Sequence, residues 1–105
     1  MGHFVKIGSK SEFEGLQGGR LVEVAGRNIA VFNVDGKLYA IDNDCTHVGG
    51  PLAEGFVSGE IVTCPWHAAQ FDLRTGQVLD GPASENVHAY PVRISGDEVE
   101  LELPD

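Results

Sequence analysis

The chain has 105 residues, about the length of one small domain, and 42% of them are hydrophobic, which excludes a disordered tail. Sixteen acidic residues outnumber seven basic ones, and the formal net charge of −9 argues against nucleic acid as a partner, because phosphates attract Lys and Arg. No apolar run approaches the roughly 20 residues that cross a bilayer. No export signal opens the sequence, so we expect a cytoplasmic protein without membrane contact.

Short strands separated by frequent turns are predicted along most of the chain. One segment, Ser9–Leu16, has the pattern of a short helix with Ser11 as its candidate cap. Asp35-Gly36 is a strong signal for a tight hairpin between two apolar segments. Segments rich in β-branched and aromatic residues predict these strands: Arg20–Val24, Ile29–Val34, Lys37–Ile41, Glu60–Cys64, Ala69–Leu73, Gln77–Leu79, Val87–Ile94 and Glu98–Leu103.

The last predicted strand, Glu98–Leu103, alternates glutamates with apolar residues. A period of two predicts that its apolar residues face the core and its glutamates face water. On a strand at the end of the chain, exposed glutamates would also discourage edge-to-edge pairing. Many short strands with frequent turns predict an all-β sandwich or barrel in a single domain, residues 1–105.

Each of the two cysteines has a histidine close behind it, in Cys45-x-His47 and Cys64-x-x-His67. A disulfide would leave both histidines unexplained and is rare in the cytoplasm. A structural zinc site can use two thiolates and two imidazoles, but it usually keeps its cysteines together and its histidines together. A two-iron cluster with unequal ligands, in which each loop supplies one thiolate and one imidazole, fits the pairing best, and the other two sites remain alternatives.

The stretches CTH and CPWH at this separation resemble the Rieske motif, C-x-H followed by C-x-x-H. GGPL after the first stretch, FDLRTG after the second and GPA at Gly81–Ala83 are similar to the same family. The resemblance covers nearly the whole chain. It implies a Rieske-type ferredoxin with three antiparallel sheets, a small cluster-binding subdomain at about residues 43–83, and one [2Fe–2S] cluster per chain.

The resemblance also implies the ligands: Cys45 and Cys64 on one iron, His47 and His67 on the other. Two ferric ions, two sulfides and two thiolates sum to zero charge, so one electron takes the site to −1. A four-thiolate site would pass from −2 to −3. Adding an electron to a neutral, partly buried centre costs less free energy, so histidine ligation raises the reduction potential.

Residues beside the four ligands are expected to shape the site. The respiratory-chain members of the family carry hydroxyl donors where this chain has Ala69 and Phe71, and neither side chain can donate a hydrogen bond. We therefore expect a potential at the low end of the Rieske range, which runs from about −150 to +300 mV. The further candidates are loop glycines and prolines (Gly49, Gly50, Pro51, Pro65, and Gly81 and Pro82 of a third, shielding loop) and two apolar covers (Leu52 and Trp66).

A resemblance to the ferredoxins of aromatic-ring dioxygenases implies an electron carrier and not an enzyme. The carrier would be a monomer that docks transiently, first with an NAD(P)H-dependent flavoprotein reductase and then with a terminal oxygenase. Acids such as Glu54, Asp72 and Glu85 are candidates for steering a basic partner. A redox-sensing or regulatory module of another oxidoreductase complex is the alternative. Of the other histidines, His3 is expected in a frayed terminus, and His88 is expected to be structural.

Overall fold

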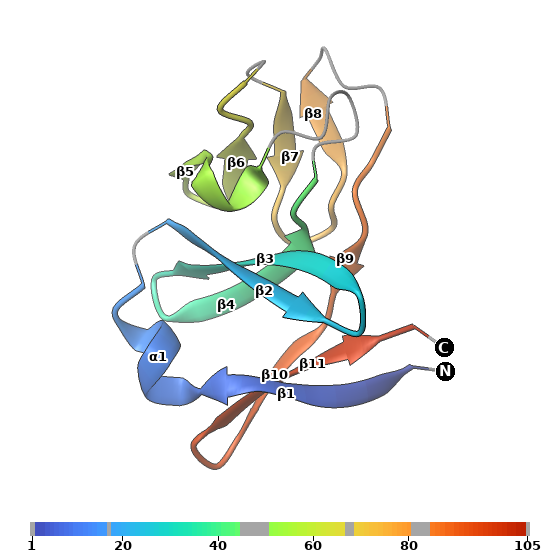
Figure 1. The fold of residues 1–105 in the computed structure, drawn as a ribbon. Coiled ribbons are helices and arrows are strands. Elements are labelled where there is room, and N and C mark those ends of the chain that lie inside the picture. The colour runs from blue at the N-terminus through green and yellow to red at the C-terminus, as the bar shows by residue number, and fades with distance from the viewer. Residues whose placement is uncertain (1, 17, 45–50, 67–68, 81–84, 105) are drawn as a thin grey trace.

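In a computed structural model the described residues fold into three antiparallel sheets with one short helix (Figure 1). The structure describes residues 2–16, 18–44, 51–66, 69–80 and 85–104. The sheets have the strand orders β1-β11-β10, β2-β3-β4-β9 and β5-β6-β7-β8, which confirms the predicted all-β fold. The elements are β1 His3–Ser9, α1 Lys10–Glu14, β2 Gly19–Val24, β3 Arg27–Val34, β4 Lys37–Asp42, the 3₁₀ turn η1 Leu52–Glu54, β5 Phe56–Ser58, β6 Ile61–Thr63, β7 Gln70–Asp72, β8 Val78–Asp80, β9 Ala89–Tyr90, β10 Val92–Ser95 and β11 Glu98–Leu103.

The middle sheet, β2-β3-β4-β9, lies between the other two in Figure 1 and contributes to both parts of the core. In β3, Ala30 and Phe32 belong to the apolar cluster shared with β6 and β7. Ile29 and Val31 belong to the cluster shared with α1 and β11. Because all four side chains are 0% exposed, β3 is buried on both faces, which explains its uninterrupted apolar run.

The β3–β4 hairpin turns where the sequence predicts it. Val34 pairs with Lys37, and the two residues between them have positive φ, +51° at Asp35 and +88° at Gly36. Two positive φ angles are typical of a type I′ turn, whose twist matches that of the flanking strands. The Asp-Gly signal is therefore confirmed.

The final strand, β11, has the predicted alternation, and its three apolar residues are buried. It is, however, the central strand of its sheet, between β1 and β10, so the expectation that its glutamates protect an edge is wrong. Two of the glutamates, Glu98 and Glu100, bind cations on the two flanking strands instead. Lys6 Nζ lies 2.8 Å from a carboxylate oxygen of Glu98, and Arg93 Nε lies 2.7 Å from one of Glu100.

Several element boundaries differ from the prediction. His3 is not in a frayed terminus: it begins β1 and pairs with Leu103. The N-cap position of helix α1 is Ser9 rather than Ser11, and the Ser9 side chain makes no capping hydrogen bond. The predicted strand Val87–Ile94 is divided into β9 and β10 at Pro91, which has no N–H to continue a ladder. No helix in the described ranges is long and apolar enough to span a membrane.

Candidate metal centre

The thiol of Cys64 is buried at the end of strand β6. Its side chain is 1% exposed, and it packs in one apolar cluster with Leu52, Ala69 and Phe71. Within the described residues it is a free cysteine. A buried thiol in an apolar wall is either an inert core residue or a ligand for a group enclosed there. The arrangement of the neighbouring chain segments bears on this choice.

The chain segment that follows β6 is fixed at both ends. The Cys64 N–H donates to the Ala69 carbonyl oxygen at 2.8 Å, just beyond the Thr63–Gln70 pair of the β6–β7 ladder. His67 lies between these ends in the sequence and outside the described residues. Pro65 is partly buried. Its expected role in stiffening the loop stays a prediction.

A second segment, residues 45–50, is also fixed at its ends. Asp44 and Pro51 form an antiparallel bridge, and Asn43 binds the returning chain twice. The Leu52 N–H donates to the Asn43 carbonyl oxygen at 2.7 Å, and the Ala53 N–H donates to Asn43 Oδ1 at 2.9 Å. Cys45, His47, Gly49 and Gly50 lie in this segment, outside the described residues.

Residues 81–84 form a third such segment, which includes Gly81 and Pro82, again outside the described residues. Before it, the Val78 N–H donates to Asn86 Oδ1 at 2.9 Å. After it, the Val87 N–H donates to the Gly76 carbonyl oxygen at 2.8 Å. The ends of all three segments are thus tied by hydrogen bonds within the described part of the fold.

Asp42, at the end of β4, binds the chain that follows residues 81–84 at two points. Its Oδ2 accepts a hydrogen bond from the His88 N–H at 3.1 Å, and its Oδ1 accepts one from the Tyr90 hydroxyl. His88 itself is exposed, and its ring contacts that of Tyr90, with centroids 4.5 Å apart and the ring planes tilted by 60°. Its expected structural role stays a prediction. Motif reading missed Asp42 and Asn43, because each acts through a partner far along the chain.

The hydroxyl of Tyr90 should lose its proton at a higher pH than an ordinary tyrosine. Its side chain is 3% exposed, and burial together with the hydrogen bond to Asp42 raises its pKa to about 12. An unfolded tyrosine has a pKa near 10. Between these values the unfolded chain loses a proton that the folded chain keeps, so we expect stability to fall as pH rises through this window. Phenolate absorbance and denaturant melts should show both effects, and Tyr90→Phe should remove the late transition; a folded protein whose tyrosines both ionise near pH 10 would contradict this.

The apolar residues predicted around the ligands fall into two groups. Leu52, Ala69 and Phe71 are each 0% exposed and form the wall around Cys64. Trp66, by contrast, is 59% exposed. Leu52 therefore has the burial expected of a cover, whereas most of the Trp66 surface faces solvent.

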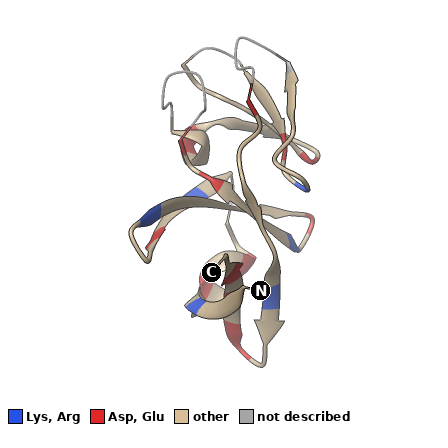
Figure 2. Ribbon diagram, turned by 90° about the vertical axis from the view of Figure 1, so that its right-hand side faces the viewer, with Lys and Arg blue, Asp and Glu red and all other residues tan. Residues whose placement is uncertain are grey.

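One acid that was expected to steer a partner, Asp72, is paired within the protein. Asp72 cannot steer a partner, because it is 8% exposed and its carboxylate binds Arg74 at 2.9 Å. The hydrogen bond from Arg74 holds the pKa of Asp72 below its usual range. Arg74 also lies 3.8 Å from Glu60, which accepts a hydrogen bond from the Tyr39 hydroxyl. This chain of contacts joins β4 to the β5-β8 sheet. Figure 2 shows the acidic residues in red and the basic residues in blue along the ribbon.

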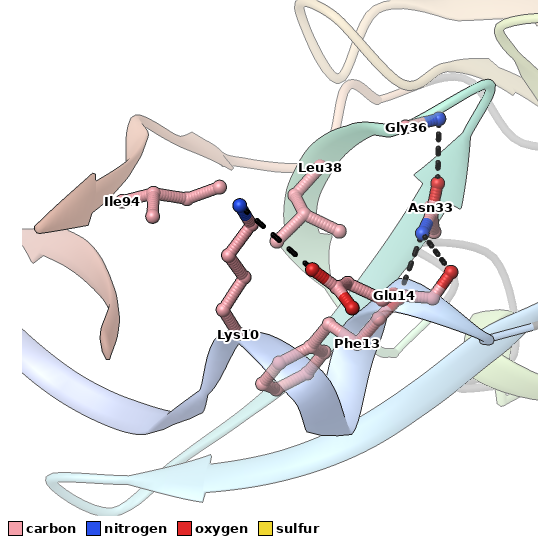
Figure 3. Close-up of a pocket in the computed structure, with 7 residues that line it drawn as sticks. All are labelled: Lys10, Phe13, Glu14, Asn33, Gly36, Leu38 and Ile94. Atoms are coloured by element: carbon pink, nitrogen blue, oxygen red, sulfur yellow. Dashed lines mark hydrogen bonds and ion pairs between the residues drawn. The ribbon is translucent and has the colours of Figure 1, made fainter. Parts of the chain in front are cut away.

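A pocket at the other end of the molecule has no spare polar group (Figure 3). Lys10 Nζ lies 3.8 Å from the carboxylate of Glu14. Asn33 Nδ2 donates to the carbonyl oxygens of Phe13 and Glu14 at 2.7 and 3.1 Å. Asn33 thus holds α1 against the β3–β4 hairpin, whereas the Lys10–Glu14 pair lies within α1, and this pocket is not a second candidate site.

The described residues fit an enclosed iron–sulfur group. They supply one buried, unpaired thiol in an apolar wall, and they hold the ends of the two segments that carry the second thiol and both imidazoles in the sequence. Among the described residues no three His, Cys, Asp or Glu side chains form an alternative metal site. Residues 3–91 match the family model of the Rieske [2Fe-2S] domain. The chain belongs to this family.

Curated relatives are ferredoxins of dioxygenase systems. The chain is 40% identical over 82 residues to the ferredoxin component of the naphthalene 1,2-dioxygenase system of Pseudomonas aeruginosa, covering 78% of this chain and 79% of the relative. It is 41% identical over 78 residues to the 3-phenylpropionate/cinnamic acid dioxygenase ferredoxin subunit of Escherichia coli O139:H28, covering 73% and 74%. The Rieske family and these ferredoxins imply a Rieske-type [2Fe–2S] cluster.

Solved structures of the same family share the fold. The ferredoxin of carbazole 1,9a-dioxygenase from Nocardioides aromaticivorans IC177 matches with a TM-score of 0.84 at 28% identity, covering 93% of this chain and 95% of that one. A complex of reduced oxygenase and oxidized ferredoxin in carbazole 1,9a-dioxygenase contains a chain that also matches with a TM-score of 0.84, at 27% identity, over 93% and 91% of the two chains.

Proposed function

We propose that this chain is a one-electron carrier, and that Cys45 and Cys64 bind one iron of its [2Fe–2S] cluster while His47 and His67 bind the other. When bound, the cluster supplies reversible one-electron transfer. The observation that carries the proposal is the buried thiol of Cys64, free among the described residues, at the base of a tethered segment in a chain of the Rieske family. The electron would come from an NAD(P)H-dependent flavoprotein reductase and pass to the terminal oxygenase of an aromatic-ring dioxygenase.

The residues around Cys64 set the conditions for this chemistry. Leu52, Ala69 and Phe71 keep water from one side of the thiolate, and none of them donates a side-chain hydrogen bond that would stabilise added negative charge. Asn43 holds the returning end of the segment that carries the other cysteine. We therefore propose a potential at the low end of the Rieske range, suited to a carrier that nicotinamide reduces through a flavin.

Three broader features belong to the same proposal. Residues 1–105 would act as a single domain whose cluster-binding subdomain spans about residues 43–83. The protein would work as a monomer in the cytoplasm. A net charge of −9 suits transient, salt-sensitive docking with basic partners.

The test is to purify the protein under exclusion of oxygen and measure iron, acid-labile sulfide and the electron paramagnetic resonance spectrum after reduction. We expect two irons and two sulfides per chain, and one electron taken up with the spectrum of a histidine-ligated cluster. Turnover should then require a reductase and an oxygenase together. A colourless zinc protein, or a chain whose two cysteines form a disulfide, would remove the proposal.

A further inference from the structure

Two apolar side chains near Cys64 are unusually exposed. Phe56 is 72% exposed and Trp66 is 59% exposed, the two highest values among the large hydrophobic residues that are described as exposed. Single exposed apolar residues are ordinary on a protein surface. Trp66, however, stands between the predicted ligands Cys64 and His67 in the sequence, and Phe56 lies on β5, which pairs with the strand that leads to Cys64.

The pairing of β5 with β6 places Phe56 on the outer face of the hairpin. Phe56 is opposite Thr63, and Ile61, two residues before Thr63, lies on the same face and is 36% exposed. On the other face, Val62 is 0% exposed and packs in the core cluster. The sheet therefore buries one of its faces and presents an aromatic ring on the other, at an edge strand.

Phe56 and Trp66 are close enough to lie under one partner. Trp66 follows Thr63 by three residues, so their Cα atoms are separated by at most about 11 Å. Opposite residues in a sheet add about 5 Å, which places the Phe56 and Trp66 Cα atoms within about 16 Å of each other. A standard interface of about 800 Å² per partner corresponds to a disc about 32 Å across, and this covers both residues.

The charge around these residues indicates the kind of protein that fits. From Leu38 to Leu73 the sequence contains no Lys or Arg, while Asp44 and Glu54 are exposed there. The next cation, Arg74, is bound by the Asp72 carboxylate. A partner with an apolar centre and a basic rim is therefore complementary to this face, and an acidic partner is excluded by repulsion.

We propose that Phe56 and Trp66 are the apolar anchors with which the reduced carrier docks on the basic protein that accepts its electron. Large aromatic side chains at the centre of an interface commonly carry most of its binding free energy, and acids around them set the encounter rate. This inference rests on the proposed function, because only a carrier has an electron acceptor. One electron leaves the carrier, which is oxidised, and enters the acceptor, which is reduced.

The test uses ferric cytochrome c as a basic electron acceptor. The holoprotein is reduced beforehand and mixed with cytochrome c in a stopped-flow instrument. We expect Phe56→Ala and Trp66→Ala each to lower the second-order rate constant about tenfold, as removal of an interface anchor does. The control variants are Leu21→Ala and Ile94→Ala, because these residues are exposed by 48% and 47% and each follows an arginine; their rate constants should stay within about twofold of the parent.

Equilibrium binding of the oxidised holoprotein to immobilised ferric cytochrome c gives a second readout without electron transfer. The two anchor variants should bind more weakly by a similar factor, with an unchanged visible spectrum and reduction potential. If Trp66→Ala loses its cluster, the Phe56→Ala variant alone tests the inference, because Phe56 lies eight residues from Cys64 in the sequence. Anchor variants that react and bind like the controls would overturn this inference and leave the carrier intact. A parent protein that contains no cluster would instead overturn the proposed function.

Discussion

A Cys64→Ser protein is expected to fold but to contain almost no iron or acid-labile sulfide. Serine has nearly the size of cysteine, so the apolar wall around position 64 should persist. Its hydroxyl does not ionise near neutral pH and is a poor ligand for iron in a sulfur-rich site. Iron and sulfide assays and the visible spectrum would measure the loss, and circular dichroism would show that the β fold remains.

Two further variants make this experiment specific. Cys64→Ala removes the ligand without burying a hydroxyl, whose lack of a partner costs about 1–3 kcal/mol, so equal iron loss in both variants assigns the effect to the sulfur. His67→Cys should instead retain iron, and its potential should fall, because a thiolate adds a negative charge to the oxidised site. A Cys64→Ser protein with full iron content and parental absorbance would remove this cysteine from the ligand set.

The sequence predicted those turns and strands that a few neighbouring residues are enough to specify. The Asp35-Gly36 turn and the alternation of β11 needed no knowledge of distant partners. Strand β1 and strand β5 were missed for the opposite reason. Lys6 looks polar in isolation, and only the pairing of β1 with β11 explains why it lies opposite Glu100 and binds Glu98. Similarly, β5 has three residues, too few to show a period, and it exists because it pairs with β6.

The same distinction applies to the site. The Cys and His residues of each motif are close in the sequence, so their spacing favoured a metal centre over a disulfide. The residues that hold these segments in place gave no such signal, because each acts at a distance along the chain. Asn43 acts on the chain ten residues later, and Asp42 binds Tyr90, 48 residues away. The exposure of Trp66 could not be predicted either, since tryptophan is highly buried on average but rarely fully buried.

Gly76 is expected to be the glycine least tolerant of substitution in the β5-β8 sheet. Its φ of +78° is disfavoured for other residues, and a Cβ there would lie 2.1 Å from the carbonyl oxygen of Val87. The backbone at Val87 is itself held by the hydrogen bond from its N–H to Gly76, so neither partner can move without breaking that bond. Positive φ and overpacking each cost about 1–3 kcal/mol, so Gly76→Ala should lose about 2–6 kcal/mol of unfolding free energy.

Gly26→Ala is the matched control, because Gly26 has almost the same φ, +77°, but no atom within 4 Å of its ideal Cβ. This variant should lose only about 1–3 kcal/mol of unfolding free energy, the cost of the backbone conformation alone. Urea melts of both variants measure the difference, which isolates the Val87 contact. Because that contact holds the chain after residues 81–84, Gly76→Ala should also speed the loss of visible absorbance in air, while Gly26→Ala should not. Equal losses of unfolding free energy in the two variants would show that the backbone around Val87 shifts to make room for the added methyl group.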